Sequence, residues 1–255
     1  MFRRILVTTD GSESAATGLG YALNIAQRHG ATLCALHVVD VKLLEGPFLR
    51  DLSASLGTAP YVNYQGKIAL LLEERGKSAL NDFREKCESS GVSCDTVQVT
   101  GIVAHAIVEQ SELADLVVMG RGGEHSQWLE GLLGSTTEAV IRRSKQPVLV
   151  TGTPDPGDDL LLAAYDGSQH ARSALRVAAN IAHDWRMRLQ LLVVGEEEDR
   201  RIVDEARDYL QAHKVDVLYE MRSGDPGEAI VQCAAESGAD LIVMGGYGHS
   251  KVREF

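Results

Sequence analysis

The segment that decides the fold is ILVTTDGS at residues 5–12, an apolar run that ends in Asp-Gly-Ser. It returns as LLAAYDGS at residues 161–168. A second segment, ADLVVMG at residues 114–120, returns as ADLIVMG at residues 239–245. Two elements repeated in the same order indicate an internal duplication, with each copy a structural unit of its own.

The boundary between the copies falls in a stretch with the composition of a linker. Residues 151–159, TGTPDPGDD, are rich in Pro, Gly and Asp. We therefore predict one domain at residues 1–153 and a second, shortened and degenerate domain at residues 158–255.

Short apolar runs alternate with helical periodicity in the first copy, which favours a parallel sheet with helices on both faces. The expected strands are residues 5–9, 32–39, 94–99, 116–119 and 147–151. The expected helices are residues 15–29, 68–90, 103–112 and 135–143. The expected fold class is α/β with two doubly wound parallel-sheet domains. The first is a five-stranded Rossmann-like sheet in the order 3-2-1-4-5, and the second lacks its last helix and strand.

Two stretches depart from this regular pattern. Residues 41–66 have no clear period and carry Pro47 and Pro60, which predicts a long loop or a lid. In the second copy, nothing after residue 248 corresponds to Gly134-Ser135 or to the strand at 147–151. A sheet that lacks this strand presents an edge open to pairing.

Composition restricts the class of protein. The net charge of -11 and the pI of about 5.2 disfavour sequence-independent binding to nucleic acids or anionic membranes, which depend on basic surfaces. No apolar run approaches the roughly 20 residues of a membrane helix, and the chain start leads directly into a strand pattern, so we expect no signal peptide, no anchor and a cytoplasmic location. The 4 cysteines show no zinc-binding spacing and are expected to be reduced thiols.

Candidate ligand-binding residues gather where strands end. Ligands of open parallel sheets bind at the carboxyl ends of the strands, where the strand order reverses. Two loops are expected to meet there, residues 8–12 and residues 119–123. Glycines in the second loop let backbone N–H groups approach an anion, and Ser135 is expected to cap a helix whose N-terminus suits a polyphosphate. Asp10 is placed to accept hydrogen bonds from an adenine amino group or a ribose hydroxyl, and Val38 to lie against the base.

Each of these signals also has an ordinary structural explanation. Gly-rich loops and Asp-Gly-Ser after a strand are common turn and capping sequences. His37, at the end of an apolar strand, is expected to be a packed core residue rather than a base. Glu124-His125 and His249 share no helix face, so no metal site is expected.

Taken together, these motifs resemble those of the universal stress protein family in its tandem two-domain form, over nearly the whole chain. The resemblance rests on residues 5–12, 36–40, 114–120 with Gly123, 134–135 and 147–150. The family pattern is Gly, two residues, Gly, nine residues, then Gly followed by Ser or Thr. Gly120 and Gly123 fit its first part, and ten residues separate Gly123 from Gly134.

What the resemblance implies is ATP binding by the first copy, with Mg²⁺ as an accompanying ion. The implied residues are Thr9, Asp10, Val38, Met119, Gly120, Gly123, Gly134, Ser135 and Thr136. To these we add Thr8, at the strand end, and Arg121, which could make a charge-assisted contact to a phosphate. In the second copy Asp166, Gly245 and Gly248 match, but Tyr165 replaces Thr9 and the phosphate half is absent, so weak or no nucleotide binding is expected there.

Three functions remain open at this point. The first is an adenine-nucleotide-binding stress or signalling protein, in which ATP orders residues 124–133 and changes a surface that partners read. The second is an assembly module without a ligand, since the resemblance implies that the strand at 147–150 pairs between domains, within the chain or in a homodimer. The third is a slow ATPase in which Asp10 or a bound metal orders water, although no catalytic residue is assigned.

Overall fold

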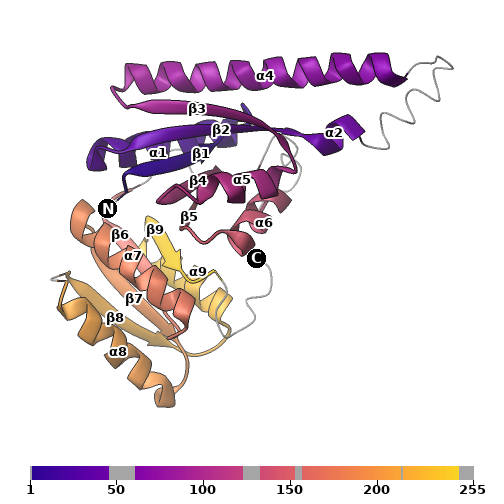
Figure 1. Cartoon of the computed structure of the whole chain (residues 1–255). Helices are drawn as coiled ribbons and strands as arrows, with labels where there is room; N and C mark the ends of the chain where they lie inside the picture. The colour runs from indigo at the N-terminus through magenta and orange to yellow at the C-terminus, as the bar shows by residue number, and fades with distance from the viewer. Residues whose placement is uncertain (1, 46–60, 123–132, 153–156, 214, 247–255) are drawn as a thin grey trace. The chain divides into compact units, whose positions relative to one another are not determined.

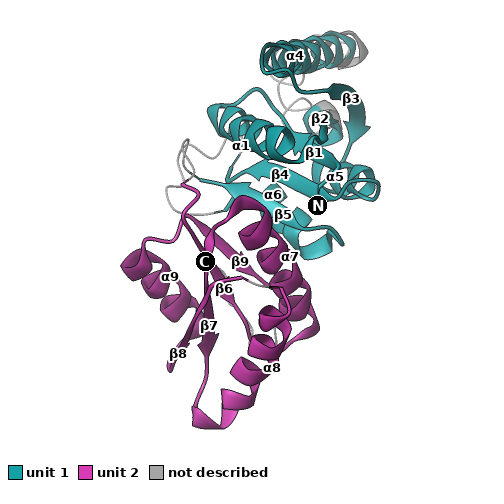
Figure 2. Cartoon of the chain, turned by 90° about the vertical axis from the view of Figure 1, so that its left-hand side faces the viewer, with its two compact units in different colours: residues 1–154 teal, residues 155–255 magenta. Residues whose placement is uncertain are grey.

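The computed structural model describes residues 2–45, 61–122, 133–152, 157–213 and 215–246. The chain divides into two compact units, unit 1 at residues 1–154 and unit 2 at residues 155–255 (Figure 2). Each unit is a parallel sheet with helices packed on it, so the predicted fold class is confirmed.

Unit 1 is built on a five-stranded parallel sheet in the order β3-β2-β1-β4-β5, as predicted (Figure 1). Its strands are β1 (Arg4–Thr8), β2 (Thr32–Asp40), β3 (Cys94–Gly101), β4 (Leu116–Gly120) and β5 (Val148–Thr151). The central strands β1 and β4 are covered on both sides, which is why they read as continuous apolar runs.

Helices cover both faces of this sheet. Their bounds are α1 (Glu13–His29), α2 (Val41–Glu45), α4 (Tyr61–Ser89), α5 (Val103–Ser111) and α6 (Ser135–Arg143). Side chains that point to opposite faces alternate along each strand. Leu6, Leu36 and Met119 therefore face α5 and α6, in one cluster with Ile107 and Val140. Helices α1 and α4 pack on the other face.

Unit 2 repeats this plan with a four-stranded parallel sheet in the order β8-β7-β6-β9. Its elements are β6 (Leu160–Ala164), α7 (Gln169–Trp185), β7 (Arg188–Val194), a 3-10 turn (Glu197–Asp199), α8 (Arg200–Gln211), β8 (Val217–Arg222), α9 (Pro226–Ser237) and β9 (Leu241–Met244). The sheet corresponds to β3-β2-β1-β4 of unit 1. As predicted, the described part of unit 2 holds no counterpart of α6 or β5.

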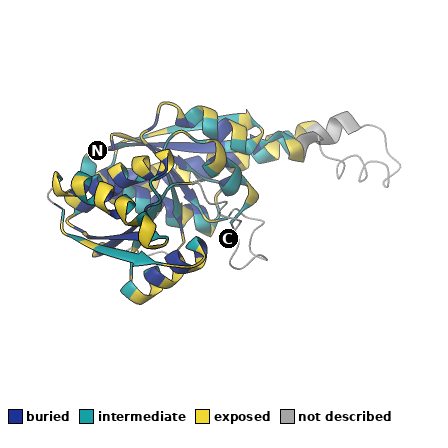
Figure 3. Ribbon diagram, turned by 90° about the horizontal axis from the view of Figure 1, so that it is seen from below, coloured by how far each residue is buried: buried dark blue, intermediate teal, exposed yellow. Residues whose placement is uncertain are grey.

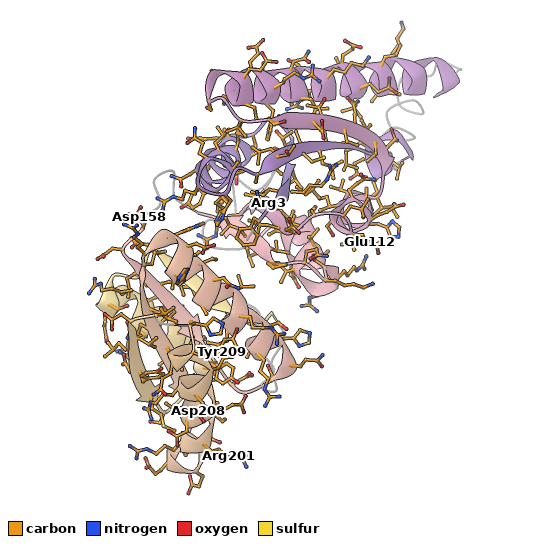
Figure 4. The ribbon with its side chains drawn as sticks, turned by 60° about the vertical axis from the view of Figure 1, so that its left-hand side comes forward. Arg3, Glu112, Asp158, Arg201, Asp208 and Tyr209 are labelled. Carbon is orange, nitrogen blue, oxygen red and sulfur yellow. The ribbon has the colours of Figure 1, made fainter. Side chains whose placement is uncertain are left out.

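The repeated Ala-Asp-Leu motif has a structural reason that the pattern alone did not reveal. One oxygen of Asp115 accepts hydrogen bonds from the backbone N–H groups of Arg3, at 2.8 Å, and Arg4, at 2.9 Å, where β1 begins. Arg3 is labelled in Figure 4. Asp240 makes the same pair of bonds at the start of β6, each 3.0 Å long. Each aspartate thus ties the beginning of one central strand to the beginning of its neighbour.

The prediction of a loop or lid over residues 41–66 is wrong at both ends. Residues 41–45 form α2, and α4 begins at Tyr61, seven residues before the predicted start at 68. Gly66 is a poor helix former, so it obscured the helical pattern before it. Residues 46–60 lie outside the described part of the chain.

Burial follows the same logic in both units. The strands β1, β2, β4, β6 and β7 and the inward faces of the helices are mostly buried, while the outward faces of the helices are exposed (Figure 3). The strands β3, β5, β8 and β9 are only partly buried. No helix that the structure describes is long and apolar enough to cross a membrane. In the same residues, no group of three His, Cys, Asp or Glu side chains is arranged to hold a metal ion.

Candidate functional site

The candidate site lies where β1 and β4 end side by side. The two strands pair in parallel, with Val7 opposite Val118, so the segments that follow them leave the same edge of the sheet. From β1 the chain continues to β2 on one side, and after β3 it returns to β4 on the other. This is the reversal of strand order at which open α/β sheets bind ligands.

The loop after β1 has a fixed conformation. The Ser12 backbone N–H donates to Asp10 Oδ1 at 2.9 Å, and Ser12 Oγ accepts from the Ala15 N–H at 3.2 Å to cap α1. Gly11 has φ of 82°, a left-handed conformation that favours glycine. The Asp10 carboxylate is thereby held in a turn at the strand tip, before any ligand arrives. Ser12 is therefore the N-cap of α1.

Gly120 at the end of β4 is required by packing. A Cβ at Gly120 would lie 2.8 Å from the carbonyl oxygen of Ser14, in the first turn of α1. Ser14 Oγ also accepts from the Gly122 N–H at 3.5 Å. Gly245 is under the same constraint in unit 2, where a Cβ would lie 2.8 Å from the Ala171 nitrogen. The glycine thus lets the first turn of the helix approach the end of the strand. From the sequence, the only reason expected for this glycine was the approach of an anion.

The N-terminus of α6 is tied to the same strand end. The Gly134 N–H donates to the Arg121 carbonyl at 3.0 Å, and Thr137 Oγ1 donates to the Gly120 carbonyl at 3.2 Å. Gly134 is the N-cap and Ser135 is the first residue of the helix, which corrects the prediction that Ser135 is the cap. Because glycine has no side chain, no side-chain cap bond closes this end of the helix.

The other predicted residues fall into three groups. Met119 is 3% exposed and belongs to the hydrophobic cluster under α5 and α6, while Val38 is partly buried against that cluster. Thr8 ends β1, and Thr9 follows it with its N–H bonded to the Leu36 carbonyl at 2.9 Å. Gly123 lies outside the described residues. The structure therefore brings Thr8, Thr9, Asp10, Met119, Gly120, Arg121, Gly134, Ser135 and Thr136 to one edge of the sheet, with Val38 on the neighbouring strand β2.

His37 is a packed residue, as predicted. It is 8% exposed, and its Nδ1 lies 2.9 Å from the Thr9 carbonyl, which can only accept, so Nδ1 carries the proton. A Cβ at Gly76 of α4 would lie 2.8 Å from His37 Nε2, so the ring packs directly against this helix. The imidazole supports the backbone of the first loop from the α4 side.

The corresponding place in unit 2 holds an interaction network of a different kind. Tyr165, at the position of Thr9, is 3% exposed and donates its hydroxyl to Glu205 of α8 at 2.5 Å. Arg172 of α7 makes two bonds to the same carboxylate, at 2.7 and 3.1 Å. Burial, and then the bond to Glu205, raise the pKa of Tyr165 to about 12. The bonds from Arg172 and Tyr165 lower the pKa of Glu205 to about 2.

Sequence reasoning missed two hydroxyl side chains that build the site, Ser14 and Thr137. Both join segments that are far apart in the chain, since their partners are Gly122 and Gly120. The one signal available was their place in the first turn of a helix that follows a candidate loop, where a hydroxyl commonly bonds to nearby backbone.

The chain resembles known proteins in sequence. The model of the universal stress protein family matches residues 1–152 and 192–255. The chain is 26% identical over 263 residues to the universal stress protein Slr1230 of Synechocystis sp., covering 98% of this chain and 92% of that protein. It is 36% identical over 157 residues to the universal stress protein MJ0531 of Methanocaldococcus jannaschii, covering 60% of this chain and 84% of that one.

A solved structure extends the likeness in fold to both units. The crystal structure of a universal stress protein from Archaeoglobus fulgidus matches with a TM-score of 0.76 at 22% identity, over 98% of this chain and 90% of that one. The chain belongs to the universal stress protein family.

Proposed function

We propose that unit 1 binds an adenine nucleotide, ATP in preference to ADP or AMP, and that occupancy changes a surface read by partners in a stress or signalling response. The observation that carries the proposal is the α6 N-terminus, which is held at the end of β4 and has no side-chain cap. A helix N-terminus carries a partial positive charge and unsatisfied N–H groups, which favour phosphate. The N–H groups of Ser135 and Thr136 are the donors proposed for the polyphosphate.

Two further features support an adenine nucleoside at the other end of the ligand. The Asp10 carboxylate, fixed in its turn, is the proposed acceptor for a ribose hydroxyl or the adenine amino group. Val38 is partly buried against the hydrophobic cluster that contains Met119, and these apolar surroundings suit the face of a base. Arg121 is the proposed charge-assisted partner of a phosphate, and Mg²⁺ is proposed to accompany the ligand on the phosphates alone.

The test is calorimetric titration of the full chain with MgATP, MgADP and AMP, accompanied by thermal unfolding. We expect affinity to fall as phosphates are removed, and the unfolding temperature to rise with ATP. Asp10→Ala should abolish the effect. Asp166→Ala is its matched control, because Asp166 accepts from the Ser168 N–H at 2.9 Å in the same turn of unit 2.

A second variant separates the phosphate site from the stability of the fold. Ser135→Asp places a carboxylate in the first turn of α6, which favours the helix dipole but repels phosphate. We expect an unchanged or raised melting temperature without ligand, and the loss of most of the ATP affinity. A parent chain that gains no stability from millimolar ATP, or equal binding of ATP and AMP, would contradict the proposal.

The alternative of an assembly module has one supporting observation. Among the described residues, β5 pairs only with β4, so its other edge is open to a further strand. Gel filtration with and without ATP distinguishes the functions, because an oligomer indifferent to nucleotide favours assembly. A change in elution volume on addition of ATP favours the proposed nucleotide-binding function.

A further inference from the structure

The internal repeat allows the strands beside the candidate site of unit 1 and the equivalent place in unit 2 to be compared at the same register. Thr8 lies opposite Leu36 in unit 1, and Ala164 lies opposite Leu192 in unit 2, so Leu36 and Leu192 are equivalent. Leu36 pairs with Val97 of β3, whereas Leu192 pairs with Glu220 of β8. Two residues further on, Val38 pairs with Val99, and Val194 pairs with Arg222. The valines of β3 are thus replaced by a glutamate and an arginine in β8.

In unit 1 the side chains at these positions of β2 and β3 are apolar. Val38, Val97 and Val99 all pack against the hydrophobic cluster beneath α5 and α6. Val99 is the direct neighbour of Val38, the residue proposed to lie against the base. A base placed on Val38 therefore continues onto another aliphatic side chain.

In unit 2 the same positions form a charged network that spans β8 and α9. Arg222 donates from Nε to Glu220 at 2.5 Å and from Nη2 to Glu236 of α9 at 2.7 Å. The other oxygen of Glu220 accepts from Gln190 Nε2, also at 2.5 Å. Gln190 is 4% exposed, and the Arg222 side chain is 22% exposed. The bonds from Arg222, and then from Gln232, lower the pKa of Glu236.

The energetic consequence for an aromatic base differs between the two units. Covering Arg222 and Glu220 with a base would remove water from charged groups whose positions are already fixed by protein partners, which is unfavourable. Covering Val99 removes water from apolar surface, which is favourable. Since the two registers are the same, these side chains favour a base at the site in unit 1 and disfavour one at the equivalent place in unit 2.

We propose that Val97 and Val99 of β3 form part of the apolar surface that binds the nucleotide base in unit 1, and that Glu220 and Arg222 at the equivalent positions exclude the base from unit 2. The proposal rests on the proposed function, because it describes the base-binding part of the same site. It assigns one nucleotide to each chain. It also assigns contact with the base to β3, and binding of the phosphates to the N-terminus of α6.

The experiment compares ATP with inorganic triphosphate, which lacks the base, by calorimetric titration of the full chain. The parent is expected to bind one ATP per chain, about tenfold or more tighter than triphosphate. Val99→Arg should weaken ATP by about tenfold or more and change triphosphate affinity by less than about threefold. Thr100→Arg, the matched control, places the same charge at an exposed position on the opposite face of β3 and should leave both affinities within about threefold of the parent.

A milder variant keeps the test decisive if Val99→Arg does not fold, as judged by circular dichroism. Val99→Thr keeps the shape of valine and replaces one methyl group with a hydroxyl, so ATP binding should weaken by about threefold or more while triphosphate binding is retained. Two ATP molecules per chain, or Val99→Arg and Val99→Thr chains that fold and bind ATP like the parent, would overturn this proposal. A parent that binds neither ligand would instead overturn the proposed function, so the two failures are distinguishable.

Discussion

Two glycines of α4 should respond in opposite directions to the same substitution, Gly→Ala. At Gly66 a Cβ meets nothing within 4 Å, whereas at Gly76 it would lie 2.8 Å from His37 Nε2. The His37 ring cannot move without losing its 2.9 Å bond to the Thr9 carbonyl. One helix therefore supplies both the test position and its control.

The magnitudes follow from three contributions. Alanine is favoured over glycine in a helix by about 1 kcal/mol. At Gly76 this gain is opposed by overpacking, which costs about 1–3 kcal/mol, and by loss of the His37 hydrogen bond, which costs about 1 kcal/mol. We expect Gly76→Ala to destabilise unit 1 by about 1–3 kcal/mol and Gly66→Ala to stabilise it by about 0.5–1 kcal/mol.

The assay is urea unfolding combined with hydrogen exchange, because two units need not unfold together. Exchange of peptides from β1 and α4 reports on unit 1 separately from unit 2. In a His37→Ala background the Gly76→Ala change should cost less, since the new methyl group can occupy the vacated space. If Gly76→Ala were as stabilising as Gly66→Ala, the packing of His37 against α4 would be refuted.

Three further predictions concern titration and strand ends. The pKa of Tyr165 is raised from 10.0 to about 12, so the stability contributed by its protonated hydroxyl is complete below pH 10.0 and is lost as pH rises toward about 12. Urea midpoints should therefore fall more steeply over this range in the parent than in Tyr165→Phe, and equal slopes would contradict the assignment. The pKa of Glu205 is lowered from 4.5 to about 2, so its contribution is present above pH 4.5 and is lost as pH falls toward about 2. Glu205→Gln should be less stable than the parent at neutral pH, and its stability should fall less as the pH is lowered. A loss of stability at acid pH equal to that of the parent would argue against the network. Asp115→Ala and Asp240→Ala should each destabilise their own unit by about 1–2 kcal/mol, because two N–H groups lose a carboxylate while water can still reach them. Hydrogen exchange at the start of β1 or β6 locates the effect, and an effect in the wrong unit would count against the reasoning.

Elements that depend on local pattern were predictable from the sequence. The buried runs of β1 and β4 lie within a residue of their predicted ends, because burial on both faces leaves a continuous apolar signature. Helix α6 matches its predicted bounds of 135–143. Helix α4 was predicted to begin seven residues too late, since Gly66 weakened a pattern that the rest of the helix sustains.

The site was predictable only where one loop supplies both partners of an interaction. The turn at Asp10 is local, with its bond to Ser12 two residues on. The packing reason for Gly120 is not local. Gly120 ends strand β4, whereas Ser14 lies in helix α1, near the start of the unit 1 sequence. The same holds for the bond from Thr137 to the Gly120 carbonyl, which exists only once α6 has docked.

Comparison of the two units also changes the reason for expecting only one of them to bind nucleotide. Tyr165 replaces Thr9, but its hydroxyl reaches α8, on the face opposite the cluster that α9 covers. Where unit 1 has His37, unit 2 has Val193, which is 1% exposed. Unit 1 thus fills the space beneath α4 with a ring from β2, and unit 2 fills the space beneath α8 with a ring from the end of β6. This exchange lies within the core on the far face, so we assign the proposed difference in base binding to Glu220 and Arg222 rather than to Tyr165.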